Sequence, residues 1–346
     1  MIKTYPEFFK NEEELEEAIS RPTPEVVKMM ETLEGDIIFL GVSGKMGISM
    51  AHMAKRACDM AGIKKRIIGV SRFSQPTNKD YLESLGIEII SGDLVDQEFV
   101  KSLPKVENVI YLAGTKFGTD GNEPYTWIMN SFIPGLVVDH YKNSRIVALS
   151  TGCVYPLVNI DSGGSLESDP ALPIGEYAQS CLGRERLFQY GSLEHKTPIS
   201  LIRLNYAVEM RYGVLVDIAL KIKNNQPVDV TMGYANIIWQ GDANAFVLRS
   251  LMLCENPARI LNLTGLERIS IHDVAKKLGK LMGREVVITG KEDKVALLSN
   301  ASNIIKSMGK PVVSVDEMIK WIADWVNSEQ RVHGKPTHFE VKDGKY

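Results

Sequence analysis

Short, almost continuously apolar runs alternate with helical stretches from residue 36 to residue 204. The runs are DIIFL from Asp36, RIIGV from Arg66, IEIIS from Ile87, NVIYLA from Asn108, RIVALS from Arg145 and SLIRL from Ser200. Strands that are buried on both faces of a parallel sheet have this composition. The helical stretches between them can supply the crossovers, so the pattern predicts an α/β fold with a doubly wound parallel sheet.

Residues 1–35 precede the first predicted strand and are expected to form a helical extension. Thr23 is a suitable N-cap, Pro24 stands at the first helical position, and Gly35 follows the last turn. The extension therefore contains at least one helix that ends just before the sheet begins.

The alternation loosens after residue 204. We expect residues 205–330 to form a smaller C-terminal α/β domain that closes over a ligand, with segments that return to pack on the sheet domain of residues 36–204. Residues 331–346 form a polar tail to which the sequence assigns no role. The elements predicted in the smaller domain are strands near Val228 and Ile237 and helices over 242–253, 271–282 and 315–327.

Composition narrows the classes of function. The net charge is only −3 and the chain has no basic stripe, which argues against a nucleic-acid partner. The four cysteines show no CxxC spacing and the histidines are scattered, so we expect reduced thiols and no bound metal. The amino terminus is acidic and no run of about 18 apolar residues occurs, so a soluble cytoplasmic protein without a membrane partner is expected.

The strongest motif is GVSGKMG, which directly follows the first predicted strand and opens an amphipathic helix. Glycines suit this corner because the turn is tight and a pyrophosphate must approach backbone N–H groups at the positive end of a helix. Strand, turn and helix together indicate a Rossmann-type dinucleotide site. The residues predicted to hold the cofactor here are Gly41, Ser43, Gly44, Lys45, Met46 and Gly47.

The end of the second predicted strand bears on the choice of cofactor. A carboxylate would normally bind the ribose 2′-OH there, but the chain has Ser71 and Arg72. A hydroxyl and a cation can accept a 2′-phosphate, so NADP is favoured and NAD stays possible. The alternative is that Arg72 stacks on the adenine and serves either cofactor.

Further motifs resemble, in order, those of the extended short-chain dehydrogenase/reductase family, the NAD-dependent epimerase/dehydratase type. The resemblance runs from residue 36 to about residue 325 and includes the GxxGxxG spacing, GDLVD, YLAG, MNSFIPG and IRLNYA. It implies a homodimer formed through the helices near Asn130 and Tyr177. It also implies further cofactor contacts at Asp93, Leu94, Leu112, Ala113, Gly114, Asn130, Tyr177 and Asn205.

The catalytic residues follow from the same resemblance. STGCVYP places Thr151 at the family's catalytic Ser or Thr, and EYAQSCLGRE places Tyr177 at its acid/base. The family's lysine, which lowers the pKa of that tyrosine from i+4, is replaced by Cys181. Because an unperturbed tyrosine has a pKa of about 10, forming tyrosinate at neutral pH costs about 4 kcal/mol.

Three features can compensate for the missing lysine. Lys116, just after the YLAG turn, can supply a cation from another loop, and Arg184 lies at i+7 on the tyrosine helix. Alternatively, Cys153 and Cys181 take a reactive role, with Cys153 two residues from Thr151 on the strand. The competing interpretations are that both cysteines are small buried thiols and that Lys116 is a solvated surface residue.

Evidence on the substrate is limited. The arginine that grips the diphosphate in many relatives acting on nucleotide sugars is absent from the matching segment YANIIWQGD, which contains Asn236. A sugar, a sugar acid or a nucleotide-sugar-like compound therefore remains open. The leading hypothesis is an NAD(P)-dependent oxidoreductase or epimerase acting on such a substrate by hydride transfer. The alternative is a catalytically silent dinucleotide-binding sensor or scaffold.

Overall fold

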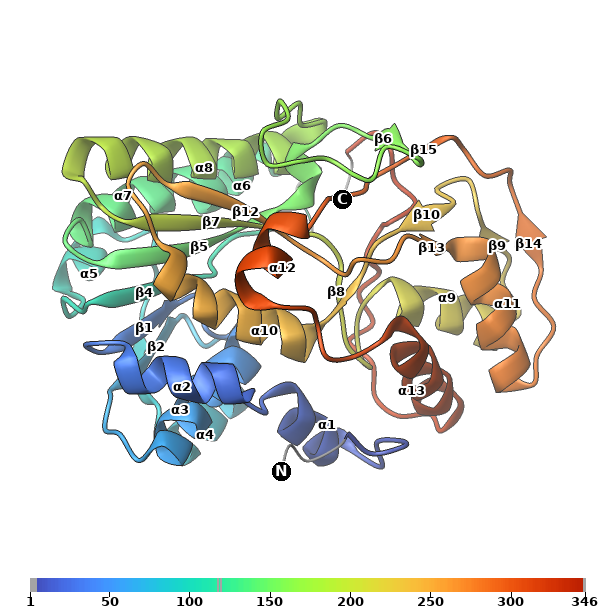
Figure 1. Ribbon diagram of the computed structural model, residues 1–346, viewed down its shortest axis with the longest axis horizontal. Coiled ribbons are helices and arrows are strands. Elements are labelled where there is room, and N and C mark those ends of the chain that lie inside the picture. The colour runs from blue at the N-terminus through green and yellow to red at the C-terminus, as the bar shows by residue number, and fades with distance from the viewer. Residues whose placement is uncertain (1–4, 117, 119, 345–346) are drawn as a thin grey trace.

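A seven-stranded, all-parallel sheet forms the centre of the larger part of the molecule (Figure 1). The computed structural model describes residues 5–116, 118 and 120–344. The strand order is β12-β7-β5-β4-β1-β2-β3, which confirms the predicted doubly wound sheet. The strands are β1 (Ile37–Leu40), β2 (Ile67–Ser71), β3 (Glu88–Ser91), β4 (Asn108–Tyr111), β5 (Arg145–Thr151), β7 (Ile199–Leu204) and β12 (Arg259–Leu263).

Helices cover both faces of this sheet because its central strands are apolar on both sides. Two separate buried clusters result, one on each face. The first face carries α2 (Pro24–Thr32), α3 (Gly47–Ala61), α10 (Gln240–Arg249) and α12 (Ser302–Met308), and the second carries α5 (Gln97–Ser102), α7 (Ile133–His140) and α8 (Gly175–His195). The helices α4 (Pro76–Ser84) and α6 (Glu123–Trp127) and the π-helical turn η1 (Ile128–Phe132) complete the crossovers.

The N-terminal extension is packed into the fold. Thr23 caps α2 by accepting from the Val26 amide at 3.4 Å, and Pro24 is its first residue, both as predicted. Val26 and Met30 are fully buried in the cluster that contains α3. The preceding helix α1 (Glu12–Ile19) instead adds its apolar side to the core of the smaller part.

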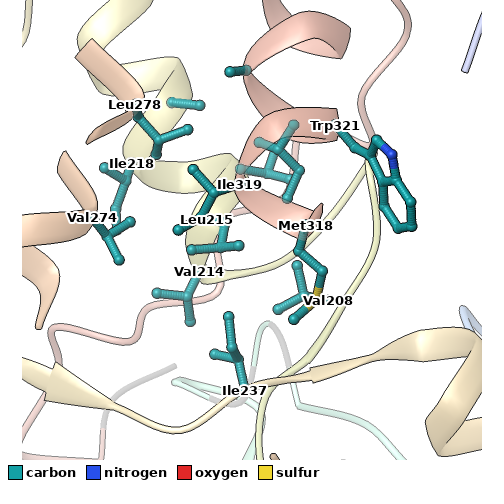
Figure 2. Close-up of a cluster of buried hydrophobic side chains, with 14 of the residues drawn as sticks. Val208, Val214, Leu215, Ile218, Ile237, Val274, Leu278, Met318, Ile319 and Trp321 are labelled. Carbon is teal, nitrogen blue, oxygen red and sulfur yellow. The ribbon is translucent and has the colours of Figure 1, made fainter. Parts of the chain in front are cut away.

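The smaller part is built around three helices, α9 (Val214–Lys223), α11 (Ile271–Met282) and α13 (Val315–Asn327). Figure 2 shows their side chains meeting in one cluster, with Leu215 and Ile218 of α9 beside Leu278 and Ile319. The bounds of α11 and α13 match the predicted ranges. Two-residue strands frame the cluster: β8 (Ala207–Val208), β9 (Val228–Asp229), β10 (Tyr234–Ala235), β11 (Ile238–Trp239), β13 (Ile269–Ser270) and β14 (Ile288–Thr289).

The chain crosses between the two parts more than once after residue 204. Strand β12 adds to the edge of the sheet beside β7, and the predicted helix over 242–253 becomes α10 followed by the 3-10 turn η3 (Ser250–Leu253), which lie on the sheet. The short pair β6 (Val158–Asn159) and β15 (Val295–Ala296) joins the loop after β5 to the C-terminal region. Among the described residues, no helix combines the length and apolar character needed to span a bilayer.

The C-terminal segment, residues 331–344, runs from the end of α13 back between the two parts, and the C-terminus lies between them in Figure 1. Phe339 is 2% exposed and belongs to the core of the smaller part. Lys342 pairs with Asp293 at 2.7 Å. The backbone of Gly344 packs on Gly175, where an added Cβ would lie 2.4 Å from the Gly344 carbonyl oxygen. This segment, called polar from its sequence, is thus held against both parts.

Candidate active site

A cavity of about 510 Å³ opens at the carboxyl ends of the central strands, where parallel α/β sheets bind ligands. It collects segments that are far apart in the sequence: the glycine turn after β1, the turn after β4, the end of β5, the start of α8 and the loop after β7. The sequence-predicted residues that line it are Gly44, Lys45, Met46, Gly47, Leu112, Gly114, Lys116, Thr151, Cys153, Tyr177 and Asn205.

The glycine turn has the shape of a phosphate cradle. Gly41 has φ +90°, and a Cβ there would lie 2.7 Å from the amide nitrogen of Ala113 on the next turn. A Cβ on Gly47 would lie 2.3 Å from the carbonyl oxygen of Val42. Helix α3 starts here, no side chain caps it, and the residues from Gly44 to Gly47 line the cavity. These features fit a dinucleotide's pyrophosphate.

The residues predicted to contact the adenosine half lie together next to this turn. The Ser43 and Ser71 hydroxyls are hydrogen-bonded to each other. Arg72 is exposed, donates to the Tyr125 hydroxyl at 3.1 Å, and lies 3.8 Å from a carboxylate oxygen of Asp93. Leu94, beside Asp93, is buried. The site therefore holds both a cation and a carboxylate, one suited to a 2′-phosphate and the other to a 2′-hydroxyl.

Thr151 and Tyr177 meet at the bottom of the cavity. Thr151 ends β5 and accepts a hydrogen bond from the Cys153 amide at 3.1 Å, while Tyr177 lies in the first turn of α8 and is hydrogen-bonded to Thr151. Burial raises the pKa of Tyr177 well above its usual value, and the Thr151 hydrogen bond acts in the opposite direction. The phenol is therefore protonated at neutral pH and can donate a proton to a substrate oxygen.

Cys181 lies behind Tyr177 and has no exposed surface. Its side chain packs with Val154 and Tyr155, and burial raises the pKa of the thiol to about 11. A neutral buried thiol is what the packing interpretation predicts. Cys153, by contrast, is half-buried and lines the cavity.

Two cations lie near Tyr177, the residue at which the resemblance expects the acid/base. The Lys116 ammonium lies 5.9 Å from the centre of the Tyr177 ring. Arg184 lines the same cavity, and its charge lowers the pKa of both Tyr177 and Cys181. Both compensating residues considered from the sequence are thus at the site.

Arg184 is fixed in place by its neighbours. Its Nη1 donates to the Leu149 carbonyl at 2.8 Å and its Nη2 to Asn130 Oδ1 at 2.7 Å, while its Nε has no partner among the described residues. A Cβ on Gly114 would lie 2.3 Å from Arg184 Nη2. The guanidinium therefore sits directly against the turn after β4, where the resemblance expects a cofactor ribose.

The two predicted asparagines hold loops in place. Asn130 lies in η1 and bonds both backbone groups of Thr115 at 2.9 Å and the Ser180 hydroxyl at 3.0 Å, so it joins the turn after β4 to α8. Asn205 donates to Asn236 Oδ1 at 2.9 Å, and Asn236 in turn donates to the Ser299 carbonyl. Asn236 lies in the segment where many relatives that act on nucleotide sugars carry a diphosphate-binding arginine, and its amide is hydrogen-bonded within the protein.

Several lining residues escaped sequence reasoning. They come from the loops before and after β8, from α10 and from the C-terminal segment: Tyr206, Tyr212, Gln240, Lys335 and Thr337. Phe339 is an aromatic residue within an otherwise polar tail, and that contrast is a sequence signal for a packed segment. The structure shows Phe339 buried. Among the described residues, no cluster of His, Cys, Asp and Glu side chains could hold a metal ion.

Comparison with known proteins gives structural neighbours only. No protein-family model matches the chain, and no curated protein sequence matches it. The solved structures that it is similar to include Pal from Bacillus thuringiensis, at 19% identity and a TM-score of 0.70, covering 85% of this chain and 100% of that one. UDP-glucuronic acid 4-epimerase from Bacillus cereus, in complex with NAD, has 17% identity and a TM-score of 0.70 over 86% of this chain and 100% of that one.

A third neighbour is dTDP-glucose 4,6-dehydratase from Bacillus anthracis in complex with NAD. It has 13% identity and a TM-score of 0.72 and covers 85% of this chain and 96% of that chain. At such identities the likeness establishes the Rossmann-type α/β fold of these epimerases and dehydratases and leaves the chemistry to be argued from the site.

Proposed function

We propose that the protein is an NAD(P)-dependent oxidoreductase or epimerase that acts on a carbohydrate-like substrate. One observation carries this proposal: a single cavity joins the glycine cradle after β1 to the hydrogen-bonded pair of Thr151 and Tyr177. The structural neighbours that are epimerases and dehydratases of nucleotide sugars support the same class of reaction. A sensor or scaffold without activity would have no need of this arrangement.

Each residue of the pair has a defined task. The bound nicotinamide would supply or accept the hydride. The Thr151 hydroxyl orients the reacting oxygen, and Tyr177 gives that oxygen a proton when a carbonyl is reduced or takes one from an alcohol when it is oxidised. Because burial raises the pKa of Tyr177, the site as it stands is better prepared for reduction.

The cofactor preference rests on Arg72, and we propose NADP with NAD as a possible substitute. Arg72 is exposed and its nearest carboxylate, on Asp93, is 3.8 Å away, so the guanidinium can turn toward a 2′-phosphate. Replacing Arg72 by Ala should weaken NADP binding at least tenfold more than NAD binding. Replacing Asp93 by Asn should do the reverse and strengthen NADP. Equal losses for both cofactors in Arg72→Ala would contradict the preference.

The central test follows nicotinamide absorbance while the protein and cofactor are incubated with a panel of sugars, sugar acids and nucleotide sugars. Turnover should fall by two to four orders of magnitude in Tyr177→Phe, as expected for loss of a general acid–base. Tyr190→Phe, an exposed tyrosine on the same helix, is the matched control and should not change turnover. If no compound changes the redox state, and none is converted to its epimer when the products are separated by chromatography, while both cofactors bind, the silent sensor becomes the better explanation.

We also propose a homodimer, built on the face of η1 and α8. Large apolar side chains are exposed along this face, among them Phe132 at 44% and Leu193 at 56%. Exposed apolar patches of this kind mark interaction surfaces. Light scattering should give twice the chain mass, and Leu193→Glu should shift the protein toward the monomer; a wild-type monomer at micromolar concentration would refute the dimer. The cytoplasmic location remains a prediction.

A further inference from the structure

Three lysines from three separate segments line the same cavity. Lys45 comes from the glycine turn after β1, Lys116 from the turn after β4, and Lys335 from the C-terminal segment. The positive charges of Lys116 and Lys335 both act on Lys45, which places the three ammonium groups within electrostatic reach of one another. Converging like charges are unfavourable unless an anion joins them.

Lys45 is the most constrained of the three. Its ammonium lies 3.1 Å from the centre of the Tyr212 ring. Burial, together with Lys116 and Lys335, lowers its pKa to about 7. Asp217 and Glu209 act in the opposite direction and do not restore the usual value. At neutral pH this lysine is therefore only partly protonated.

The two nearby carboxylates are bonded to other groups. Asp217 Oδ2 accepts from the Thr337 amide at 2.8 Å and from the Thr337 hydroxyl at 2.6 Å. Glu209 is buried and pairs with Arg211 at 3.1 Å. Both acids are thus bonded to other groups of the protein, and the described residues that line the cavity include the three lysines and neither of these acids.

The C-terminal segment also limits the size of the substrate. Thr337 lines the cavity, and its carbonyl accepts from the Lys116 ammonium at 3.0 Å. Buried Phe339 holds the segment in place next to it. The cavity of about 510 Å³ must take the reactive end of the cofactor as well as the substrate, which leaves room for a compact molecule.

We propose that Lys45, Lys116 and Lys335 bind the carboxylate of a small polyhydroxylated acid whose reacting carbon lies at Thr151 and Tyr177. This inference deepens the proposed function and rests on it. A carboxylate can be shared by several ammonium donors through its two oxygens. The substrate class is then a sugar acid without a nucleotide, selected by a lysine that the C-terminal segment contributes.

The test is calorimetric titration of the cofactor-saturated protein with gluconate and glucuronate, each beside its neutral amide or parent sugar. The acids should bind at least tenfold more tightly than the neutral analogues. Lys335→Met should reduce that preference three- to tenfold and leave cofactor affinity unchanged. Lys320→Met, an exposed lysine on α13, is the control and should not alter the preference.

Proton linkage provides a second readout that does not depend on turnover. A bound carboxylate raises the pKa of Lys45, so binding should take up a fraction of a proton near pH 7 and weaken as pH rises from 6 to 8.5. Titrations in buffers of different ionisation enthalpy measure the uptake, and Lys45→Met should abolish it. If Lys335→Met abolished the proton uptake and Lys45→Met did not, the titrating group would be Lys335, which would contradict the assignment to Lys45.

Three results would overturn the inference. One is equal binding of acids and neutral analogues, or no binding of either. Another is acid binding that disappears when the cofactor is saturating, because the lysines would then serve the cofactor's phosphates. The third is tighter binding of inorganic phosphate or a sugar phosphate than of the carboxylates. Acid binding without hydride transfer would contradict the proposed function and leave the carboxylate site intact.

Discussion

A buried polar network that includes Ser150, the neighbour of Thr151, supports a stability prediction. Glu185 of α8 accepts from the Ser150 hydroxyl at 2.6 Å and pairs with Arg203 of β7 at 2.7 Å. Arg203 also donates to the Tyr155 hydroxyl at 2.7 Å, which donates to Asn262 of β12 at 2.9 Å. Glu185 is 0% and Arg203 2% exposed, so this network joins β5, α8, β7 and β12 away from water.

Glu185→Gln should lower the free energy of unfolding by about 3–5 kcal/mol. The reason is that Arg203 would keep its charge in the interior without a carboxylate, which is the costly way to break a buried pair. At about 2.1 cal/mol/K per residue for 346 residues, the unfolding entropy is about 0.7 kcal/mol/K. The melting temperature should therefore fall by about 4–7 °C.

Thermal unfolding and urea titration measure this loss. Glu194→Gln, at an exposed position on the same helix, is the control and should change stability by less than about 0.5 kcal/mol. The double variant Glu185→Met with Arg203→Met should lose less than Glu185→Gln alone, because both charges are gone. A loss below about 1 kcal/mol in Glu185→Gln, or a double variant as unstable as the two single changes combined, would refute the reasoning.

Three further predictions concern the site itself. Gly114→Ala should lower the free energy of unfolding by about 1–3 kcal/mol and weaken cofactor binding, because its Cβ would press on Arg184. Gly135→Ala in α7, where the added Cβ would lie 3.9 Å from Leu187, should be neutral or stabilising. Melting curves and cofactor titrations compare the two variants. Alcohol oxidation should rise about tenfold per pH unit up to pH 9 or beyond, because the raised pKa of Tyr177 leaves little tyrosinate at lower pH, while carbonyl reduction should stay flat; pH–rate profiles test both. Asp217→Asn should expose the C-terminal segment to limited proteolysis, because that carboxylate holds Thr337; a cleavage rate equal to wild type would contradict it.

The central fold could be predicted because its signals are local. Six apolar runs and the GxxGxxG turn each specify a strand or a tight corner without reference to distant residues. The helices α11 and α13 were located to the residue because each has a serine N-cap and a regular apolar stripe. The strand β12 was missed because Asn262 interrupts its apolar run, and that asparagine is explained by its hydrogen bonds to Tyr155, Ser165 and Asn300, which are distant in the sequence.

The sequence predicts many residues of the candidate site but misses those that the C-terminal segment contributes. Thr151, Tyr177 and the glycine cradle follow from motifs, whereas the contribution of Lys335 and Thr337 depends on a tail that returns to the cavity over a long sequence separation. No periodicity in residues 331–344 reports that return. Only the tertiary contacts of Phe339 and Asp217 explain it.

The resemblance puts Cys181 where the family has a lysine, and the packing around Cys181 bears on the proposed reaction. A lysine at position 181 would begin in a fully buried pocket of Val154 and Tyr155, next to the place that the Arg184 guanidinium already fills against Gly114. The arginine is held by two hydrogen bonds and stays charged at any working pH, so it gives a fixed cation rather than one that can follow the substrate. Burial raises the pKa of Tyr177, and such a cation only partly opposes that rise. The phenol therefore stays protonated. A site that holds its tyrosine in the acid form is suited to deliver protons, so we expect carbonyl reduction to be the favoured direction of the proposed reaction.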